Sequence, residues 1–357
     1  MKNIESLIAP TTVTIKDAWK RINLNSSRIL FIIDTAKQIV GTISDGDIRR
    51  WVLADKSLNE NVLAATNTNP IIADDSTPRE SIRKLLLEKS IGCVPIVNAE
   101  REICDVVFAT DFLDAPQDSP RKESMPQIPV VIMAGGSGTR LNPFTKILPK
   151  ALIPIGEKPI IEVIIERFRE YAVKDFYISV NYKAAMIKAY FFENHDAYNL
   201  EFFEETKPLG TAGSLYLLKD KLNSTFFVSN CDILIDANYK DILDFHTKNS
   251  ADITIVCSMI HSKLPYGVVQ ISTGGELKSI VEKPEIDSLV NTGMYLINYA
   301  MLDLIPENDF FNMTSLIETV QKRGGRVLVY PVSEKSWVDI GQLEEYQSTL
   351  RKLEGMQ

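Results

Sequence analysis

Two stretches near the N-terminus repeat each other without gaps when the chain is shifted by 64 residues. Residues 30–34 and 41–47 fall on residues 94–98 and 105–111. A helical pattern precedes each copy, at residues 16–22 and 79–87. Each copy therefore predicts a helix, two strands joined by a turn, and an acidic helix start. Because one copy is too small to bury both faces of its sheet, we expect the two copies to pack together.

The sequence pattern changes after a polar, proline-containing stretch at residues 115–127. This stretch predicts a linker. Downstream, short runs typical of buried strands alternate with helical patterns. The expected strands are residues 130–133, 176–180, 226–229 and 253–257, and the expected helices are residues 160–171, 183–194, 211–219 and 239–248. This alternation favours an α/β domain with a largely parallel sheet, helices on both faces and ligands at the carboxyl ends of the strands.

Charge and composition exclude several classes of protein. The 357 residues carry 39 basic and 47 acidic side chains, and the net charge of −8 argues against general nucleic-acid binding. The four cysteines are far apart and no His-Glu-x-x-His pattern occurs, so we expect no zinc site. No apolar run approaches the length of a membrane span and the start carries no signal-peptide pattern, which predicts a cytoplasmic protein.

A glycine-rich loop follows the first strand of the second domain and carries the strongest chemical signal. Glycines let the backbone approach a phosphate closely, and consecutive N–H groups suit an anion. Two cations follow at fixed spacing, and the sequence matches neither a Walker loop nor a dinucleotide loop. The segment contains Gly135, Gly136, Ser137, Gly138, Thr139, Arg140 and Lys150.

The motif from Gly136 to Lys150 resembles the signature of sugar-1-phosphate nucleotidyltransferases, and the resemblance extends over about residues 128–357. It implies a Rossmann-like mixed sheet of the GT-A kind. It also implies that Gly135, Gly136, Ser137, Gly138 and Thr139 hold the nucleotide phosphates. Arg140 would then contact the leaving pyrophosphate, and Lys150 would bridge the reacting phosphates.

Later segments agree with this resemblance. Residues 209–213 resemble the family loop for base and ribose, with Gly210 and Thr211 as contacts. Asp232 follows a buried strand where the family places a magnesium ligand, and Asp339 lies in a segment resembling the second metal-binding segment. Carboxylate oxygens at a strand end suit Mg²⁺, so we expect Mg²⁺ as the cofactor.

Three further segments resemble the sugar side of the family site. Glu282 would bind sugar hydroxyls and Lys283 the sugar phosphate, which makes Lys283 the third catalytic cation beside Arg140 and Lys150. The backbone of Gly267 would lie against the sugar. The segment from Asn291 to Tyr295 would close the sugar pocket, with Asn291 and Thr292 at the sugar.

Glu205 is the position that informs the choice of base. Related enzymes for pyrimidine nucleotides carry Gln near this register, and its amide suits a pyrimidine edge. A carboxylate only accepts hydrogen bonds, whereas guanine presents two adjacent donors. Glu205 therefore favours GTP, with a solvated acidic side chain as the alternative.

Residues 1–114 resemble a pair of CBS motifs, a Bateman module, which in that family often binds adenosine nucleotides and regulates an attached enzyme. Ser44 and Asp47 fit the family pattern for ribose and phosphate. In the second copy Phe108 replaces the hydroxyl residue and only Asp111 remains, so we expect one site, for an adenosine or guanosine nucleotide. The alternative is that both Asp residues merely begin helices.

The resemblances together predict a cytoplasmic enzyme of nucleotide-sugar and glycan biosynthesis, with residues 1–114, 115–127 and 128–357 as CBS pair, linker and transferase domain. It would transfer a guanylyl group from GTP to a sugar 1-phosphate. The domain order resembles PtmE-type glucosamine-1-phosphate guanylyltransferases of the legionaminic acid route, which ranks glucosamine 1-phosphate first. Mannose or heptose 1-phosphate is the alternative, and a non-catalytic nucleotide-sensing regulator is an alternative of another class. We expect a homodimer or a higher homo-oligomer.

Overall fold

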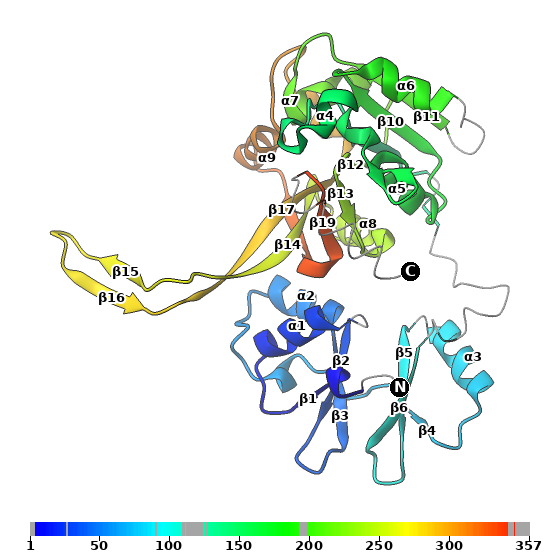
Figure 1. The fold of residues 1–357 in the computed structure, drawn as a ribbon, viewed down its shortest axis with the longest axis vertical. Coiled ribbons are helices and arrows are strands. Elements are labelled where there is room, and N and C mark those ends of the chain that lie inside the picture. The colour runs from blue at the N-terminus through cyan, green and yellow to red at the C-terminus, as the bar shows by residue number, and fades with distance from the viewer. Residues whose placement is uncertain are drawn as a thin grey trace. The chain divides into compact units, whose positions relative to one another are not determined.

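The computed structural model describes residues 4–25, 28–89, 91–108, 111, 124–125, 127–192, 199–341 and 346. The chain divides into two compact units, residues 1–121 and 122–357 (Figure 1). The expected linker at residues 115–127 lies outside the described residues, except for residues 124–125 and 127.

The first unit contains two copies of one small fold, which confirms the repeat. Each copy has a three-stranded sheet, in the orders β1-β2-β3 and β4-β5-β6. The elements are β1 (Ile8–Pro10), α1 (Ile15–Leu24), β2 (Ile29–Ile33), β3 (Ile39–Ser44), α2 (Asp45–Leu53), β4 (Ala73–Asp74), α3 (Arg79–Lys89), β5 (Cys93–Val97) and β6 (Ile103–Phe108). Even the strand bulge recurs, between Ile32 and Ile33 in one copy and between Ile96 and Val97 in the other.

Local sequence explains the first helix and its packing. Thr14 and Asp17 form a reciprocal capping box that satisfies N–H groups at the start of α1. The helix then buries one side, including Trp19 and Ile22. A shared core joins the two copies, because Phe31 of β2 and Val106 of β6 belong to one buried cluster.

A seven-stranded mixed sheet organises the second unit, in the order β11-β10-β7-β12-β17-β14-β18. Strand β17 runs antiparallel to both neighbours, and the other pairs are parallel. The strands are β7 (Val130–Met133), β10 (Asp175–Val180), β11 (Asn199–Glu204), β12 (Phe226–Asn230), β14 (Ile253–Lys263), β17 (Glu285–Ile297) and β18 (Val327–Ser333). The expected mixed α/β fold is confirmed.

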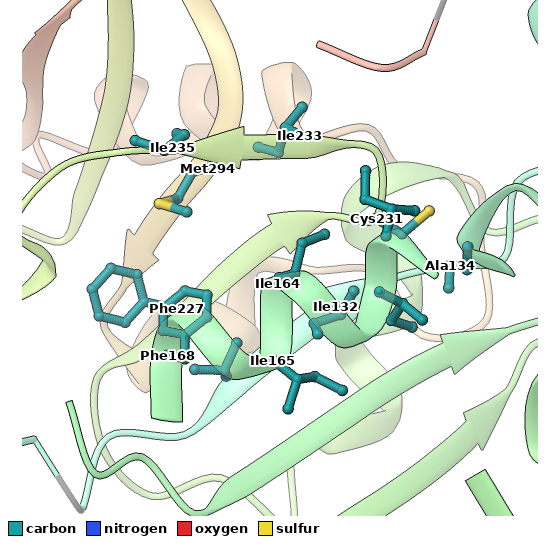
Figure 2. Packing of buried hydrophobic residues seen from close by; sticks show 14 of the residues in the cluster. Ile132, Ala134, Ile164, Ile165, Phe168, Phe227, Cys231, Ile233, Ile235 and Met294 are labelled. Carbon is teal, nitrogen blue, oxygen red and sulfur yellow. The ribbon is translucent and has the colours of Figure 1, made fainter. Parts of the chain in front are cut away.

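Helices cover both faces of this sheet, so alternate residues of β7 enter different cores. Val130 and Ile132 pack into one cluster, whereas Val131 packs into the other. On the first face, Ile164, Ile165 and Phe168 of one helix pack near Ile132 and Phe227 (Figure 2). The helices are α4 (Phe144–Ile147), α5 (Ile160–Arg169), α6 (Ala184–Phe192), α7 (Gly210–Gly213), α8 (Tyr239–Lys248) and α9 (Met313–Lys322). Burying one such aliphatic or aromatic side chain contributes about 1.5–3 kcal/mol.

One expected helix differs in the structure. Residues 211–219 form the short turn α7 followed by a 3-10 helix, Ser214–Leu218. A Cβ on Gly210 or Gly213 would lie 2.7 or 2.6 Å from a backbone oxygen of the segment 309–311. This close approach of a second backbone replaces a longer regular helix. Residues 193 and 194 of the expected helix at 183–194 lie outside the described residues.

Six short strands of the second unit, among the described residues, lie outside the main sheet. Strand β13 (Ile233–Ile235) pairs antiparallel with β19 (Trp337–Asp339), which fixes the segment after Asp232 against the segment containing Asp339. Strands β15 (Val268–Ile271) and β16 (Leu277–Val281) form a separate hairpin. The remaining two, β8 (Pro154–Ile155) and β9 (Lys158–Pro159), pair beside α5. In the described part of the chain, no helix has the length and apolar character needed to cross a bilayer.

Candidate active site

The glycine-rich loop begins where β7 ends and turns at Gly138, whose φ is +66°. A Cβ there would lie 2.9 Å from the Cβ of Lys150 and 2.9 Å from the Cγ2 of Thr145, so the position requires glycine for both conformation and space. The Thr145 hydroxyl donates to the Gly138 carbonyl at 2.9 Å. Lys183 Nζ donates to the carbonyls of Thr145 and Lys146 and holds that segment in place.

A pocket of about 400 Å³ opens beside this loop, at the carboxyl ends of β7 and β12. Most of the expected nucleotide and metal residues meet there. The lining includes Gly135, Gly136, Gly138, Thr139, Arg140, Lys150, Glu205, Gly210, Thr211 and Asp232. Ser137 lies in the same loop with an exposed side chain and is absent from the described lining.

Lys150, Asp232 and Asp339 converge on Gly341 although they come from three separate segments. Lys150 Nζ forms an ion pair with Asp232 Oδ2, and the Gly341 N–H donates to Asp339 Oδ1 at 2.7 Å. A methyl group on Gly341 would lie 2.5 Å from Asp232 Oδ2, 2.8 Å from Asp339 Oδ1 and 3.2 Å from Lys150 Nζ. The pairing of β13 with β19 brings the two carboxylates together, so the arrangement depends on the fold rather than on sequence proximity.

A second loop closes another side of the pocket through hydrogen bonds around Glu205. Its Oε1 accepts from the Ser179 hydroxyl at 2.6 Å, and its Oε2 accepts from the Leu209 N–H at 3.1 Å. Gly210 has a φ of +82°, and the Thr211 hydroxyl accepts from the Met313 N–H at 2.9 Å. The carboxylate of Glu205 thus organises this loop, and its remaining lone pairs are available in the pocket.

The expected sugar residues do not line this pocket. Gly267, Glu282 and Lys283 lie beside the β15–β16 hairpin, where the side chains of Glu282 and Lys283 are exposed. Asn291 donates to the Tyr295 hydroxyl at 2.7 Å, and the buried Thr292 hydroxyl donates to the Val256 carbonyl at 2.8 Å.

The next residue, Gly293, approaches the pocket edge, because a Cβ on it would clash with the side chain of the pocket residue Asn230. The structure therefore brings residues 291–293 near the pocket and leaves the rest of the sugar group apart.

Three pocket residues were missed by the sequence reasoning. Asn181 and Asn230 follow or end strands β10 and β12, so the rule that ligands lie at carboxyl strand ends could have found them. Asn181 Nδ2 donates to the Glu205 carbonyl at 2.8 Å. Phe310 lies in the pocket with 60% of its surface exposed, and no local pattern marks it. Hydrogen bonds between Phe311 and residues 209–213 bring that loop to the pocket.

Cys231 in the pocket and the buried His246 of α8 are not suited to act as a nucleophile or a general base. Burial, followed by the nearby Asp232 charge, raises the pKa of the Cys231 thiol to about 12, so it remains protonated near neutrality. Burial lowers the pKa of His246 to about 4, and the His246 ring instead pairs with the Thr254 hydroxyl at 2.9 Å.

A second pocket, of about 450 Å³, lies in the first unit and includes Ser44, Asp47, Arg28 and Arg50. Ser44 and Asp47 form a capping box at the start of α2: the Ser44 N–H donates to Asp47 Oδ2 at 2.8 Å. Asp47 also forms an ion pair with Arg50. In the second copy the Phe108 N–H donates to Asp111 Oδ2 at 2.9 Å, and Asp111 is not part of the pocket lining. Asp47 therefore acts at a helix start and lines this pocket, whereas Asp111 accepts the equivalent backbone hydrogen bond outside the pocket lining.

Comparison with known families identifies the second unit. Residues 129–355 match the nucleotidyl transferase family model. The chain belongs to the nucleotidyl transferase family. Residues 3–54 and 62–118 of this nucleotidyl transferase match the CBS domain model, one match for each structural repeat.

Curated relatives of this nucleotidyl transferase include mannose-1-phosphate guanyltransferases. The protein from Yarrowia lipolytica is 35% identical over 229 residues, covering 61% of this chain and 62% of the relative. The protein from Saccharomyces cerevisiae is 34% identical over 236 residues, with 61% and 62% covered. The chain thus spans less than two thirds of the length of the curated relatives it matches.

A solved structure, HddC from Yersinia pseudotuberculosis complexed with GMP-PN, is similar in fold. The TM-score is 0.51 at 26% identity, with 64% of this chain and 100% of that chain covered.

Proposed function

We propose that this chain transfers a guanylyl group from GTP to a sugar 1-phosphate and releases pyrophosphate. The observation that carries the proposal is the pocket, where a glycine loop, Arg140, Lys150 and Asp232 meet. Relatives named as mannose-1-phosphate guanyltransferases and a similar structure complexed with GMP-PN support the guanine nucleotide.

The chemistry requires positioning and charge neutralisation more than proton transfer. A phosphate oxygen of the sugar 1-phosphate forms a bond to the α-phosphorus of GTP while the bond to pyrophosphate breaks. The second pKa of a phosphate monoester is about 6, so the attacking group is ionised near neutrality and needs no general base. Arg140 would stabilise charge on the leaving pyrophosphate and Lys150 charge on the reacting phosphates. The backbone N–H groups of residues 135–139 would orient the triphosphate.

The carboxylates of Asp232 and Asp339 fit a magnesium ion. Both are hard oxygen donors directed at the same point beside Gly341, and the Lys150 ammonium stands as a cation next to Asp232. The described residues contain no cluster of three or more such ligands. Two carboxylates suffice, because Mg²⁺ usually takes one or two carboxylates together with substrate phosphates. When bound, the ion supplies neutralisation of charge on the phosphates.

Base selection would fall to the loop around Glu205. The Glu205 oxygens accept from the Ser179 hydroxyl and the Leu209 N–H, which leaves acceptor capacity for the two donors of guanine. Phe310 lies in the same pocket and offers an exposed ring for stacking on the base. Gly210 and Thr211 would shape the ribose side of this loop.

Two sugar 1-phosphates are the leading candidates for the second substrate. The curated relatives favour mannose 1-phosphate, so it now stands ahead of glucosamine 1-phosphate, which the domain order favours. Gly267, Glu282, Lys283, Asn291 and Thr292 remain the proposed sugar-phosphate residues.

A substrate panel tests the proposal. Pyrophosphate release is measured with Mg²⁺, four nucleoside triphosphates, and mannose, glucosamine, glucose and heptose 1-phosphates. We expect the highest rate with GTP and either mannose 1-phosphate or glucosamine 1-phosphate. A preference for a pyrimidine triphosphate contradicts guanylyl transfer, and the absence of turnover with every pair favours a nucleotide sensor without catalysis.

For the first unit we propose one regulatory nucleotide site, for an adenosine or guanosine nucleotide. The pocket that contains Ser44 and Asp47 supports it, because Arg28 and Arg50 supply cations for phosphate beside these polar groups. Asp111 accepts from the Phe108 N–H outside the lining of this pocket and is left out of this site.

A further inference from the structure

Lys183 connects the end of β10 with the segment behind the glycine loop. It lies in the turn between β10 and α6 with a φ of +54°, an uncommon conformation for a residue with a side chain. Its ammonium donates to the Thr145 carbonyl at 3.1 Å and to the Lys146 carbonyl at 2.7 Å. The last carbonyls of a helix lack partners within the helix, and a lysine side chain can supply them. Lys183 therefore closes the C-terminal end of α4 from a different part of the chain.

Through Thr145, this contact reaches the glycine loop. The Thr145 side chain is only 2% exposed, and its hydroxyl donates to the Gly138 carbonyl at 2.9 Å. Its Cγ2 lies 2.9 Å from the position that a Cβ on Gly138 would take. Gly138 precedes the 3-10 helix Thr139–Leu141, which carries Arg140. The placement of α4 therefore determines the placement of the turn and of the Arg140 backbone.

The turn after β10 also contacts the loop around Glu205. Asn181 lines the pocket, and its Nδ2 donates to the Glu205 carbonyl at 2.8 Å. Lys183 follows closely in the sequence but is absent from the described lining of the pocket. Two side chains of one turn thus support different parts of the nucleotide site. Asn181 supports the loop proposed for the base, and Lys183 supports the glycine loop.

We propose that Lys183 is a positioning residue for the β- and γ-phosphates of the nucleotide, and that it acts through Thr145 and Gly138 without touching the substrate. The inference rests on the proposed function, because that function places the triphosphate on the glycine loop. The base depends on the loop around Glu205, and the reacting phosphate depends on Lys150. Loss of the Lys183 contact therefore affects the part of the nucleotide that leaves as pyrophosphate.

The charge of Lys183 makes this contact strong enough to matter. A hydrogen bond from an ionised donor is roughly twice as strong as one between neutral groups. Without the ammonium, the carbonyls of Thr145 and Lys146 lose this donor, and α4 is free to shift together with Gly138. Backbone N–H groups bind phosphate oxygens only at short range, so a small displacement of the glycine loop weakens several contacts at once.

A comparison of GTP with GMP tests the proposal, because GMP contains the base, the ribose and the α-phosphate but lacks the β- and γ-phosphates. Binding is measured by calorimetry with Mg²⁺ on full chains that also carry Asp47→Ala, which weakens the proposed nucleotide site of the first unit. We expect Lys183→Met to weaken GTP binding at least about tenfold, the scale of a lost hydrogen bond to a charged group, and to leave GMP binding unchanged. An equal loss for both nucleotides, or no loss for GTP, would overturn the proposal.

Matched variants separate positioning from stability. Lys183→Arg keeps donors for both carbonyls and should restore most of the affinity for GTP. Lys188→Met removes the same charge from α6, where Lys188 pairs with Glu204 at the surface, and should leave both affinities unchanged. Asn181→Ala removes the hydrogen bond to the loop around Glu205 and should weaken GMP and GTP by the same factor. If Lys183→Met does not fold, Lys183→Gln, which keeps an amide donor, takes its place in the same comparison.

A double-mutant cycle tests the route through Thr145. Thr145→Val removes the hydroxyl that donates to the Gly138 carbonyl and nearly keeps the size of the side chain. Because two groups that act through one chain of contacts are not additive, Lys183→Met combined with Thr145→Val should bind GTP about as weakly as the weaker single variant. Fully additive losses would overturn the route through Thr145. The proposed guanylyl transfer fails separately, when the wild-type chain binds GTP but releases no pyrophosphate with any sugar 1-phosphate of the substrate panel.

Discussion

Lys150 and Asp232 form an ion pair across 82 positions of sequence, with side chains that are only 13% and 12% exposed. The pair joins the segment after the glycine loop to the end of β12. Because solvent screens this ion pair little, each charge depends on the other. Removal of one charge leaves the other largely buried and without a compensating charge.

Substitution of the two proposed magnesium ligands should therefore have different effects on the free energy of unfolding but similar effects on activity. Asp232→Asn and Asp339→Asn should each reduce turnover about a thousandfold, since several kcal/mol of transition-state stabilisation is lost. Asp232→Asn should also lower the free energy of unfolding by up to about 3 kcal/mol, because it strands the Lys150 charge. Asp339→Asn keeps an acceptor for the Gly341 N–H and should stay near wild type in stability. Pyrophosphate release and denaturant unfolding measure both quantities, and wild-type turnover by either variant would remove that residue from the metal site.

Gly341→Ala should disable the site without unfolding the chain. The new methyl group would lie 2.5 Å from Asp232 Oδ2, so the carboxylates must separate. We expect a large loss of Mg²⁺-dependent turnover with an unchanged circular dichroism spectrum.

Gly136→Ala is the comparison, because its Cβ would meet nothing within 4 Å in the protein. It should leave the free energy of unfolding unchanged and raise the KM for GTP, through crowding of the phosphates alone. An equal loss in the free energy of unfolding for Gly341→Ala and Gly136→Ala would contradict this distinction between a crowded and an open glycine.

Glu205→Gln should shift base preference. The amide can still accept from the Leu209 N–H and donate to the Ser179 hydroxyl, so the loop is retained. The N–H donors of guanine, however, lose an acceptor on the protein. By analogy with base readout, the change should cost about 1–3 kcal/mol, a drop of roughly 5- to 150-fold in kcat/KM for GTP. UTP and dTTP should gain relative to GTP.

Ser179→Ala serves as its control, because it removes one hydrogen bond to Glu205 and keeps the carboxylate. It should lower activity slightly with the same order of triphosphates. If both variants keep the wild-type order, Glu205 positions the loop and does not select the base.

The proposed regulatory site predicts one nucleotide per full chain. Calorimetry of the full chain with AMP, ATP, GMP and GTP should detect it as a binding event separate from that at the transferase pocket. Asp47→Ala should weaken binding at least tenfold. Asp111→Ala removes the equivalent hydrogen bond, to the Phe108 N–H, in the second copy and should leave the affinity unchanged. Equal effects of the two substitutions would mean that both act through the stability of the module.

Stability of the second unit should fall below pH 6.5 because of His246. Burial lowers its pKa to about 4 in the folded chain, against an ordinary value of 6.5, so the unfolded chain binds more protons between these values. Stability is therefore complete above pH 6.5 and declines as the pH falls toward 4, by about 2 kcal/mol at pH 5. His246→Gln should remove this component when unfolding is compared at pH 7.5 and pH 5. An unchanged difference between the two pH values would assign the effect to other groups.

Local patterns predicted the elements that they alone determine. The spacing of Ile160, Ile164 and Phe168 predicted helix α5, and the glycine loop was placed after β7 because each signal lies within a few residues. The convergence of Asp232 with Asp339 was implied only by family resemblance, since it depends on the β13–β19 pairing across about 100 residues.

The sequence did not reveal the antiparallel β17 or the exposed β15–β16 hairpin. A run such as residues 268–271 reads as an ordinary half-buried strand, and nothing in its alternation tells whether the apolar side meets its own domain or solvent. Phe310 was missed for a similar reason, because backbone contacts of its neighbour Phe311 decide where it lies.

The two CBS copies share one core, to which Phe31 contributes from the first copy and Val106 from the second. Neither half can be inherited alone, since deleting one would expose the buried side of the other. Recombination that moves this module between enzymes must therefore carry the pair as a single cassette. Divergence is left to positions such as Ser44 and its counterpart Phe108, where a duplicated unit can lose a hydroxyl group without losing its fold.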